Sequence, residues 1–270
     1  VFGDNEAYDN NVYIKGSIQA NVNVSEVVGG KTYNGIAKRN NVYLTDVNAA
    51  GAVIGGQTVN SRNPDIAAGV ADDNSVNILR GNINGDIYGR WDASTAGQSA
   101  DGNTVGLTDA VIGSALVYGG FSAVQSQNNS VSISGYGTSF SNASATLAGG
   151  NHGLDGNTLT TTTALNLRLG TIENFENYIF NMTANEMDQT VYSVASAVEF
   201  TGTNHTLNFD ATVGRPLHEG QVLVRIDNTA HGDTLSEDKF VKHIKDGFLY
   251  NYDSFFGLKG NSLVFEMLDK

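Results

Sequence analysis

The sequence predicts an all-β fold and, within that class, a parallel β-helix (solenoid). The chain of 270 residues contains 32 Gly but 2 Pro, and 16% of its residues are charged. This composition is typical of proteins rich in strands and turns. A short motif, N-x-V-x-I, also recurs at intervals of 26–34 residues. Because one such interval has room for three short strands, it fits one turn of a β-helix.

The repeated motif begins at Asn10, Asn40, Asn74, Asn103, Asn129 and Asn157. Each copy is a turn residue followed by alternating apolar and polar residues, the pattern of a short strand with one buried face. Asn tolerates positive φ, so we expect these asparagines to occupy left-handed corners of the stack. We also expect each side-chain amide to pair with the Asn one turn away.

A second element follows several copies of the motif at a similar offset. Residues 81–89 (GNINGDIYG) are its clearest copy, and residues 47–56 and 111–120 are looser ones. One period therefore contains a strand, a tight turn, a second strand, a glycine turn, a third short strand, Gly-Gly and a variable polar loop. Competing β folds fit less well, because a propeller blade needs about 40–45 residues. Stretches such as 57–73 are also too long for hairpin turns.

The chain changes character after about residue 165. Phe occurs 3 times up to residue 150 and 9 times after it. We therefore divide the chain into β-helix coils over residues 1–165 and C-terminal coils with an aromatic-rich cap over residues 166–270. A solenoid needs such a cap because its last turn otherwise exposes an apolar cross-section. Residues 236–245 predict one short helix in this cap, with Ser236 as N-cap and Phe240 and Ile244 on one face.

Residues 74–89 combine N-x-V-x-I with G-x-I-x-G-D-I-Y-G. Two later stretches have a different sequence pattern: residues 174–182 (NFENYIFNM) and 260–265 (GNSLVF). The repeat resembles the passenger domains of Gram-negative autotransporter proteins, and the later stretches are similar to the segment that precedes the membrane barrel in that family. The resemblance implies a right-handed β-helix that is secreted and then displayed outside the outer membrane or released. It also implies that residues 166–270 resemble the autochaperone region, which helps the helix fold during export.

Composition is compatible with export and excludes several partners. The chain has no Cys, so no disulfide can lock an unfolded chain in an oxidising compartment. Its net charge of −13 includes 15 dispersed basic residues, too few to build a phosphate-binding face for nucleic acid. The apolar runs are too short to span a bilayer. We therefore expect neither a nucleic-acid partner nor membrane insertion by this segment.

Catalytic and metal-binding motifs are missing from the sequence. The five histidines lie singly, without the spacing of a zinc site, and neither Ser132-Ile133-Ser134-Gly135 nor Gly232-Asp233-Thr234-Leu235 matches a hydrolase nucleophile motif. We therefore predict no catalytic residue, no metal and no cofactor. Polysaccharide hydrolysis would need carboxylates and bases in one cleft. The residues of the right type are Asp72, Asp73, His152 and Arg225.

Binding is the remaining class of function, and we place it in the loops between strands. The stretch Arg90-Trp91-Asp92 contains the single Trp of the chain, and the insertion over residues 57–73 adds Arg62 and Asp65. A Trp between Arg and Asp can stack on a sugar ring or anchor a protein contact. The alternative interpretation is that Trp91 folds back and covers a coil.

These observations predict a non-enzymatic passenger that recognises a protein or glycan of the host-cell surface, as an adhesin or a host-directed effector. We expect it to be secreted or exposed on the bacterial outer membrane. Two alternatives stay open. One is an enzyme that degrades polysaccharide or glycan in a groove of the β-helix, and the other is a structural stalk or self-associating protein.

Overall fold

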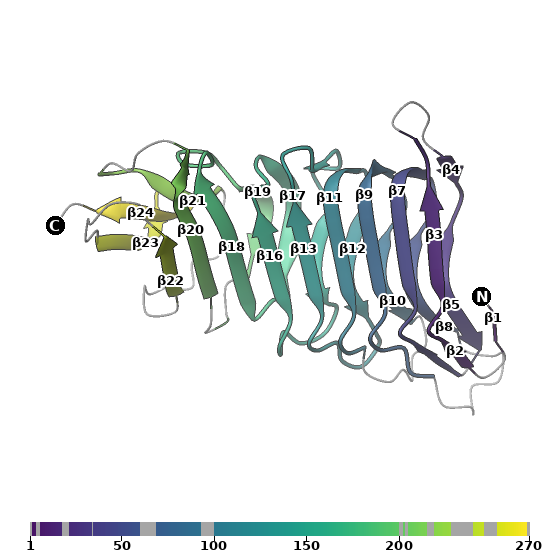
Figure 1. Cartoon of the computed structure of the whole chain (residues 1–270). Coiled ribbons are helices and arrows are strands. Elements are labelled where there is room, and N and C mark those ends of the chain that lie inside the picture. Colours follow the sequence, from purple (N-terminus) through teal and green to yellow (C-terminus); the bar gives the residue numbers. More distant parts are fainter. Residues whose placement is uncertain are drawn as a thin grey trace.

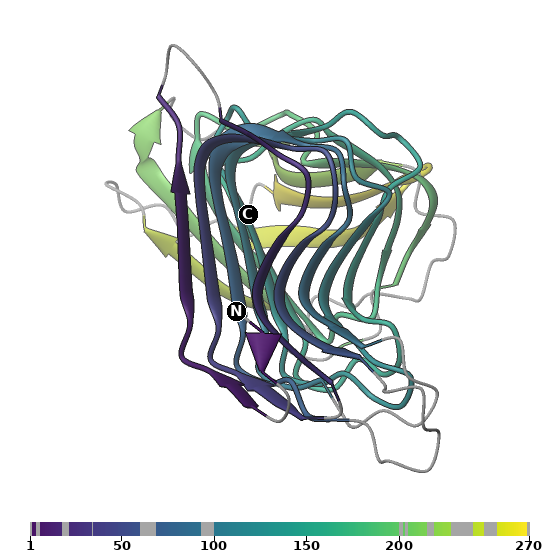
Figure 2. The same cartoon turned by 90° about the vertical axis from the view of Figure 1, so that its right-hand side faces the viewer.

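The computed structural model describes residues 2–3, 6–17, 22–33, 35–59, 69–92, 100–199, 202, 205–214, 219–227, 240–245 and 253–268. Over these residues the chain forms an all-β parallel solenoid of about six turns. Figure 1 shows an elongated stack of strands that follows the sequence from one end to the other. In Figure 2 the successive turns are nested one behind the next. The predicted parallel solenoid is confirmed.

Two long sheets line the stack. Sheet I has the strand order β1-β5-β8-β10-β12-β15-β17-β19-β21-β24-β23. Its strands span Phe2–Gly3 (β1), Val27–Tyr33 (β5), Val53–Val59 (β8), Ile87–Asp92 (β10), Leu116–Phe121 (β12), Thr146–Gly150 (β15), Leu167–Glu173 (β17), Tyr192–Val198 (β19), Val222–Asp227 (β21), Ser262–Leu268 (β24) and Asp253–Lys259 (β23).

Sheet II has the strand order β22-β20-β18-β16-β13-β11-β9-β7-β3. Its strands span Phe240–Lys245 (β22), His205–Gly214 (β20), Asn177–Ala184 (β18), Thr158–Thr162 (β16), Ser130–Ser134 (β13), Thr104–Ile112 (β11), Ser75–Ile83 (β9), Asn41–Ala49 (β7) and Asn11–Lys15 (β3). Strand β4 (Val22–Val24) pairs with β7 and β14 (Ser139–Phe140) with β11. Strands β2 (Glu6–Tyr8) and β6 (Ile36–Lys38) form a separate pair.

The C-terminal end of the described structure differs from the prediction. Residues 240–245 form strand β22, which pairs with β20 in parallel, so the predicted helix is wrong over this range, and residues 236–239 lie outside the described residues. Alternation at Val241, His243 and Lys245 fits a strand, and pairing with the edge of sheet II outweighs a weak helical preference. Sheet I ends in two antiparallel pairs, β21–β24 and β24–β23.

Each copy of the N-x-V-x-I motif starts a strand of sheet II. The apolar positions of the motif point into the solenoid. Val12 and Ile14 of the first copy are partly buried. In the next four copies these side chains are at most 2% exposed: Val42, Leu44, Val76, Ile78, Val105, Leu107, Val131 and Ile133. Neighbouring copies are paired in register, so that Val76 lies beside Val42 and Val105. The period-two pattern therefore produces a continuous apolar core along the axis of the stack.

The motif asparagines form a ladder of side-chain hydrogen bonds inside the solenoid. From Asn40 to Asn157 they are fully buried. In each link the backbone N–H and the Nδ2 of one Asn both donate to the Oδ1 of the Asn one turn further along. Both distances are 3.0 Å from Asn40 to Asn74, and they are 3.0 and 3.1 Å from Asn74 to Asn103. The predicted amide pairing is confirmed.

The left-handed corner lies one residue before each asparagine of the ladder. The residues with positive φ are Asp9, Arg39, Asp73, Gly102, Asn128 and Gly156, and the six motif asparagines are not among the residues with positive φ in the described structure. The prediction that the motif asparagines adopt this conformation is therefore wrong. The chain turns at the preceding residue, and this directs the Asn side chain inward, where its amide satisfies buried donors and acceptors.

Glycines opposite the ladder make room for the amides. A Cβ added to Gly30 would lie 2.5 Å from Cγ of Asn40, and one added to Gly56 would lie 2.4 Å from Cγ of Asn74. Both distances are shorter than carbon atoms tolerate. The Gly-Gly pairs of the repeat are therefore required by close packing against the ladder.

The core contains larger side chains after about residue 165. Among the described residues, the aromatic side chains that are at most 1% exposed are Phe175, Tyr178, Phe180, Tyr192, Phe209 and Phe265. The asparagine ladder ends at Asn157, whose Nδ2 donates to the carbonyl oxygen of Asn174 at 3.1 Å. The parallel pairs β15–β17 and β16–β18 connect the two parts, so the stack continues across this change.

Candidate functional site

The outer face of sheet II carries a regular array of uncharged polar side chains. On strands β7, β9, β11, β13 and β16, residues alternate with the buried core positions and point outward. We call these outward residues the polar face: Asn41, Tyr43, Thr45, Ser75, Asn77, Leu79, Thr104, Gly106, Thr108, Ser130, Ser132, Ser134, Thr158, Thr160 and Thr162. None of them is charged, and stacked strands hold them about 4.8 Å apart.

Hydrogen bonds between turns fix side chains of the polar face. Ser75 Oγ donates to Asn41 Oδ1 at 2.6 Å, and Asn41 Nδ2 donates to Oδ1 of Asn11 at 3.0 Å. The hydroxyl groups of Thr108 and Ser134 are 2.7 Å apart. Because the partners sit on different turns of a rigid stack, these groups are ordered before any ligand arrives, which lowers the entropic cost of binding.

One hollow in the described part of sheet II lies at Gly106, within the polar face. It has a volume of about 310 Å³, and Tyr43, Leu79 and Ser132 are among its lining residues. Gly106 creates the space, because a Cβ at this position would lie 3.0 Å from Asn77 Oδ1 and 3.5 Å from Ser132 Oγ. At one end of the polar face the ring of Tyr43 stacks on Tyr13, with centroids 4.7 Å apart.

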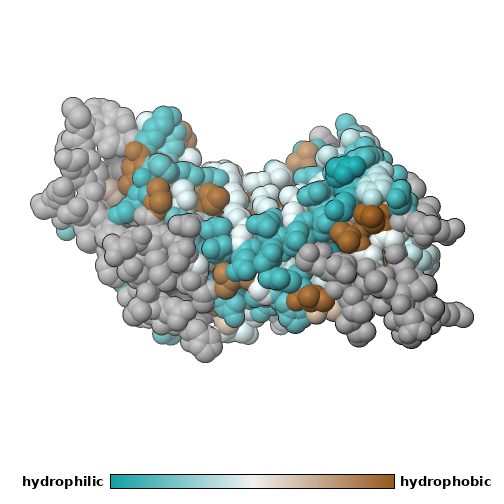
Figure 3. Space-filling view, turned by 90° about the horizontal axis from the view of Figure 1, so that it is seen from below, coloured by the Kyte–Doolittle hydropathy of each residue, from teal (hydrophilic) through white to brown (hydrophobic). Residues whose placement is uncertain are grey.

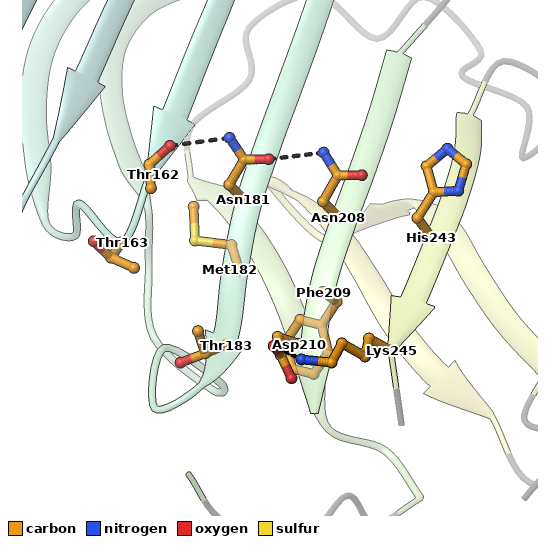
Figure 4. A pocket seen from close by; sticks show the side chains of 10 residues that line it. All are labelled: Thr162, Thr163, Asn181, Met182, Thr183, Asn208, Phe209, Asp210, His243 and Lys245. Atoms are coloured by element: carbon orange, nitrogen blue, oxygen red, sulfur yellow. Dashed lines mark hydrogen bonds and ion pairs between the residues drawn. The ribbon is translucent and has the colours of Figure 1, made fainter. Parts of the chain in front are cut away.

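Another hollow, shown in Figure 4, lies further along the same sheet, on β16, β18, β20 and β22, and has a volume of about 400 Å³. A chain of hydrogen bonds crosses it: Asn208 Nδ2 donates to Asn181 Oδ1 at 2.7 Å, and Asn181 Nδ2 donates to Thr162 Oγ1 at 3.0 Å. At its edge, Lys245 Nζ lies 2.8 Å from Asp210 Oδ2. The hydrogen bond from Lys245 lowers the pKa of Asp210 to about 2, so this carboxylate is ionised and is a poor general acid.

Two rows of charged residues border the polar face along its length. One row contains Asp9, Arg39 and Asp73, which precede the strands. The other contains Asp46, Arg80 and Asp109, which lie within β7, β9 and β11; all six have positive φ. Arg39 Nε lies 2.6 Å from Asp9 Oδ1, and Arg80 Nε lies 2.8 Å from Asp46 Oδ1. These hydrogen bonds lower the pKa values of Asp9 and Asp46. Each row contains two carboxylates and one guanidinium, and the exposed Lys15 of β3 adds a positive charge near Asp46 at one end of the second row.

Arg90 and Asp92 do not lie in a loop, because strand β10 continues through both residues. They are 0% and 1% exposed, and Arg90 Nη2 lies 3.0 Å from Asp92 Oδ2. Arg90 occupies the register position that is Gly56 and Gly120 on the neighbouring turns. These buried side chains do not reach a partner at the surface of this structure. The other two residues predicted for binding, Arg62 and Asp65, lie outside the described residues.

Trp91 is half-buried at the margin of a second apolar cluster, separate from the main core. The cluster includes Tyr88, Tyr118 and Phe121. The rings of Tyr88 and Tyr118 stack with centroids 6.0 Å apart, and Phe121 meets both of them edge-on. Burial raises the pKa of Tyr118 to about 12. Trp91 therefore covers part of a turn, as the alternative interpretation of the sequence has it.

Trp91→Ala is expected to lower the free energy of unfolding by about 1–2 kcal/mol, because a half-buried ring loses its apolar contacts. As the single Trp of the chain, Trp91 should also emit at a shorter wavelength in the folded protein than in urea. Urea titration followed by circular dichroism measures the first effect, and fluorescence measures the second. An unchanged midpoint together with an emission spectrum that does not move on unfolding would contradict this placement.

The residues considered for polysaccharide hydrolysis do not meet in the described structure. Asp72 pairs with Lys38 at 2.9 Å. His152 is exposed before β16, which lies three strands along sheet II from β9, the strand that follows Asp72. Arg225 lies on β21, with its Nε 2.7 Å from Asp227. Within the described ranges, no group of His, Asp and Glu side chains is placed to hold a metal ion.

The lower edge of the stack in Figure 1 faces the viewer in Figure 3. Its described surface is mostly hydrophilic, with apolar residues in small separate groups. The part of the chain that is described contains no helix with the length and hydropathy needed to cross a bilayer. No protein-family model, no curated protein and no solved structure matches this chain.

The polar face was not predicted from the sequence, because the candidate binding residues were placed in loops between strands. A signal was present in the sequence: the x positions of N-x-V-x-I are mostly Ser, Thr or Asn, as in residues 129–134 and 157–162. Reading these positions as one surface requires the register of all turns at once. The hollow at Gly106 additionally depends on which residues lie on both neighbouring strands.

Proposed function

We propose that the chain is a recognition module that binds a molecule of the host-cell surface, and that the polar face of sheet II is its contact surface. The observation that carries this proposal is the ordered, uncharged array on five stacked strands. Such an array offers many directional donors and acceptors and no charged group that could act as acid or base.

Pairing of seven described carboxylates with cations supports binding rather than catalysis at these residues. In the described structure, acidic residues with an Arg or Lys ion-pair partner are Asp9, Asp46, Asp72, Asp92, Asp210, Asp227 and Glu266. Glycoside hydrolysis needs one protonated and one ionised carboxyl on either side of the bond. Carboxylates paired with cations in this way are suited to stabilising turns.

The proposal also includes a cellular setting. We propose an autotransporter-type passenger that is secreted or displayed on the outer membrane, with residues 166–270 acting as its autochaperone-like region and C-terminal cap. The resemblance of the repeat supports this setting, as does the absence of Cys in the chain. The large aromatic residues in the core after residue 165 are compatible with a segment that folds first.

The test is a binding assay with two matched variants. Ser132 lies at the centre of the polar face on β13, and Ser196 is exposed on β19 of sheet I. The soluble chain is incubated with cultured host cells and with arrays of cell-surface glycans and proteins. We expect Ser132→Trp to weaken binding about tenfold or more, because the indole covers the array, whereas Ser196→Trp should bind like the original protein.

Two results would contradict the proposal. One is the absence of binding to any cell, glycan or surface protein. The other is equal binding by both variants, provided that circular dichroism shows the same β-rich fold for each. Turnover of a glycan without stable binding would instead favour the enzymatic alternative.

A further inference from the structure

We infer that the ligand of the polar face is an uncharged glycan, bound at the hollow around Gly106. This inference rests on the proposed function and adds the chemical class of the ligand. The relevant observations are the hydrogen-bonding groups of the face, the charges that border it and the shape of the hollow.

The groups of the polar face match the hydroxyl groups of a sugar. Ser and Thr hydroxyls donate and accept hydrogen bonds, and Asn amides do both with separate atoms. Sugar hydroxyls have the same dual character. Asn77, Thr108 and Ser132 bring such groups to the hollow from three neighbouring strands. A ligand with alternating donors and acceptors would find partners here without burying a charge.

The charges around the face disfavour an anionic ligand. The rows Asp9–Arg39–Asp73 and Asp46–Arg80–Asp109 each have one carboxylate in excess, and the whole chain has a net charge of −13. Both guanidinium groups already bind a carboxylate. A sulfated, sialylated or uronic-acid glycan at the hollow would therefore meet an excess of carboxylates along both borders, while the exposed Lys15 lies on β3, three strands along sheet II from Gly106.

The hollow has apolar walls beside its polar groups. The ring of Tyr43 and the side chain of Leu79, which is 36% exposed, line it together with the polar residues. A pyranose ring presents C–H groups on its faces and hydroxyls around its rim, so it suits a surface of this mixed kind. The volume of about 310 Å³ lies at the lower end of the range of ligand sites, roughly 300–1,000 Å³.

Calorimetric titration with defined oligosaccharides tests the inference. The neutral probes are cellohexaose, mannohexaose and chitohexaose, and the anionic probes are hexagalacturonate and a heparin hexasaccharide. We expect at least one neutral probe to bind and the anionic probes not to bind. Because no ion pair forms, affinity should change less than about twofold between about 0.1 and 1 M NaCl, over which the Debye length falls from about 10 to about 3 Å.

Gly106→Thr is the decisive variant, because it fills the hollow while adding only a hydroxyl and a methyl group, which suit the face. Thr favours strands over Gly, and the added Cβ meets the flexible end of Asn77 at 3.0 Å, so the fold should be retained. We expect binding of the neutral probe to weaken about tenfold while the urea midpoint is unchanged or higher. Tyr43→Ser removes the aromatic wall without touching Gly106, and should also weaken binding.

The outcomes separate the inference from the function on which it rests. If Ser132→Trp abolishes binding but the bound molecule is a protein or an anionic glycan, the polar face is the site and the ligand class inferred here is wrong. Neutral-glycan binding that survives both Gly106→Thr and Tyr43→Ser also overturns the inference. If binding of every probe is insensitive to Ser132→Trp, the proposed function is wrong as well.

Discussion

Asn74→Ala is expected to lower the free energy of unfolding by about 3–5 kcal/mol. Asn74 is fully buried in the middle of the ladder. Its Oδ1 accepts from the N–H and the Nδ2 of Asn40, both at 3.0 Å, and its Nδ2 donates to Asn103 Oδ1 and to the Ala37 carbonyl at 3.1 and 2.9 Å. Alanine would remove the acceptor of the Asn40 N–H and Nδ2, the donor to the Ala37 carbonyl and one of the two donors to Asn103 Oδ1.

Urea unfolding followed by circular dichroism measures this effect as a lower midpoint. Asn77→Ala is the matched control, because Asn77 lies three residues further along the same turn, on β9, and is exposed. Its effect should stay within about 0.5 kcal/mol. Equal midpoints for the two variants would mean that the ladder contributes no more to stability than a surface amide does.

Asp92→Thr is expected to destabilise the chain by about 3–5 kcal/mol, since it leaves the guanidinium of Arg90 buried without its carboxylate. Both side chains are at most 1% exposed. The adjacent turn has Gly56 and Thr58 at the register positions of Arg90 and Asp92. The double variant Arg90→Gly/Asp92→Thr therefore has the same residue types as the adjacent turn at these two register positions.

The double variant should recover most of the stability lost in the single variant, because removing both charges removes the cost of burying them. Thermal and urea unfolding of the original protein, the single variant and the double variant measure the recovery. If the double variant is no more stable than Asp92→Thr alone, Arg90 stabilises its turn through packing or through other partners, and the ion pair is not the main contribution.

The sequence predicted the repeat well because both requirements of a turn are local. Alternation at Val42 and Leu44 identifies the buried face, and Asn40 marks the corner. The residue with positive φ at each corner was harder to predict. Asn tolerates positive φ, yet the residue before each motif Asn adopts this conformation. Arg39 adopts this conformation although Arg seldom does, so backbone propensity alone pointed to the wrong residue.

Features that depend on register were harder to predict. Arg90 was predicted to lie in a loop because it follows Gly89. Its burial depends on Gly56 and Gly120, which lie beside it on the neighbouring turns. Residues 240–245 have apolar residues at helical spacing, but exposure alternates over 241–245 as in a strand, because the segment pairs with β20. In both cases the deciding partner lies one turn away, more than 25 residues distant in the sequence.

The asparagine ladder is also a row of aligned electric dipoles. Every described link from Asn40 to Asn157 points the same way, with the amide oxygen toward the first turn and the Nδ2 toward the last. Aligned amides polarise one another and strengthen each bond. Like a helix macrodipole, the row has a positive end, and it lies at Asn157.

Negative groups gather at that positive end. The Nδ2 of Asn157 donates to the carbonyl oxygens of Ser126, Gly153 and Asn174 at 2.9, 3.2 and 3.1 Å. The carboxylate of Glu176 lies beside it and accepts from the N–H of Gly156 at 2.6 Å. The transition to the turns with aromatic core residues is thus also the point at which carbonyl oxygens and a carboxylate face the positive end of the ladder.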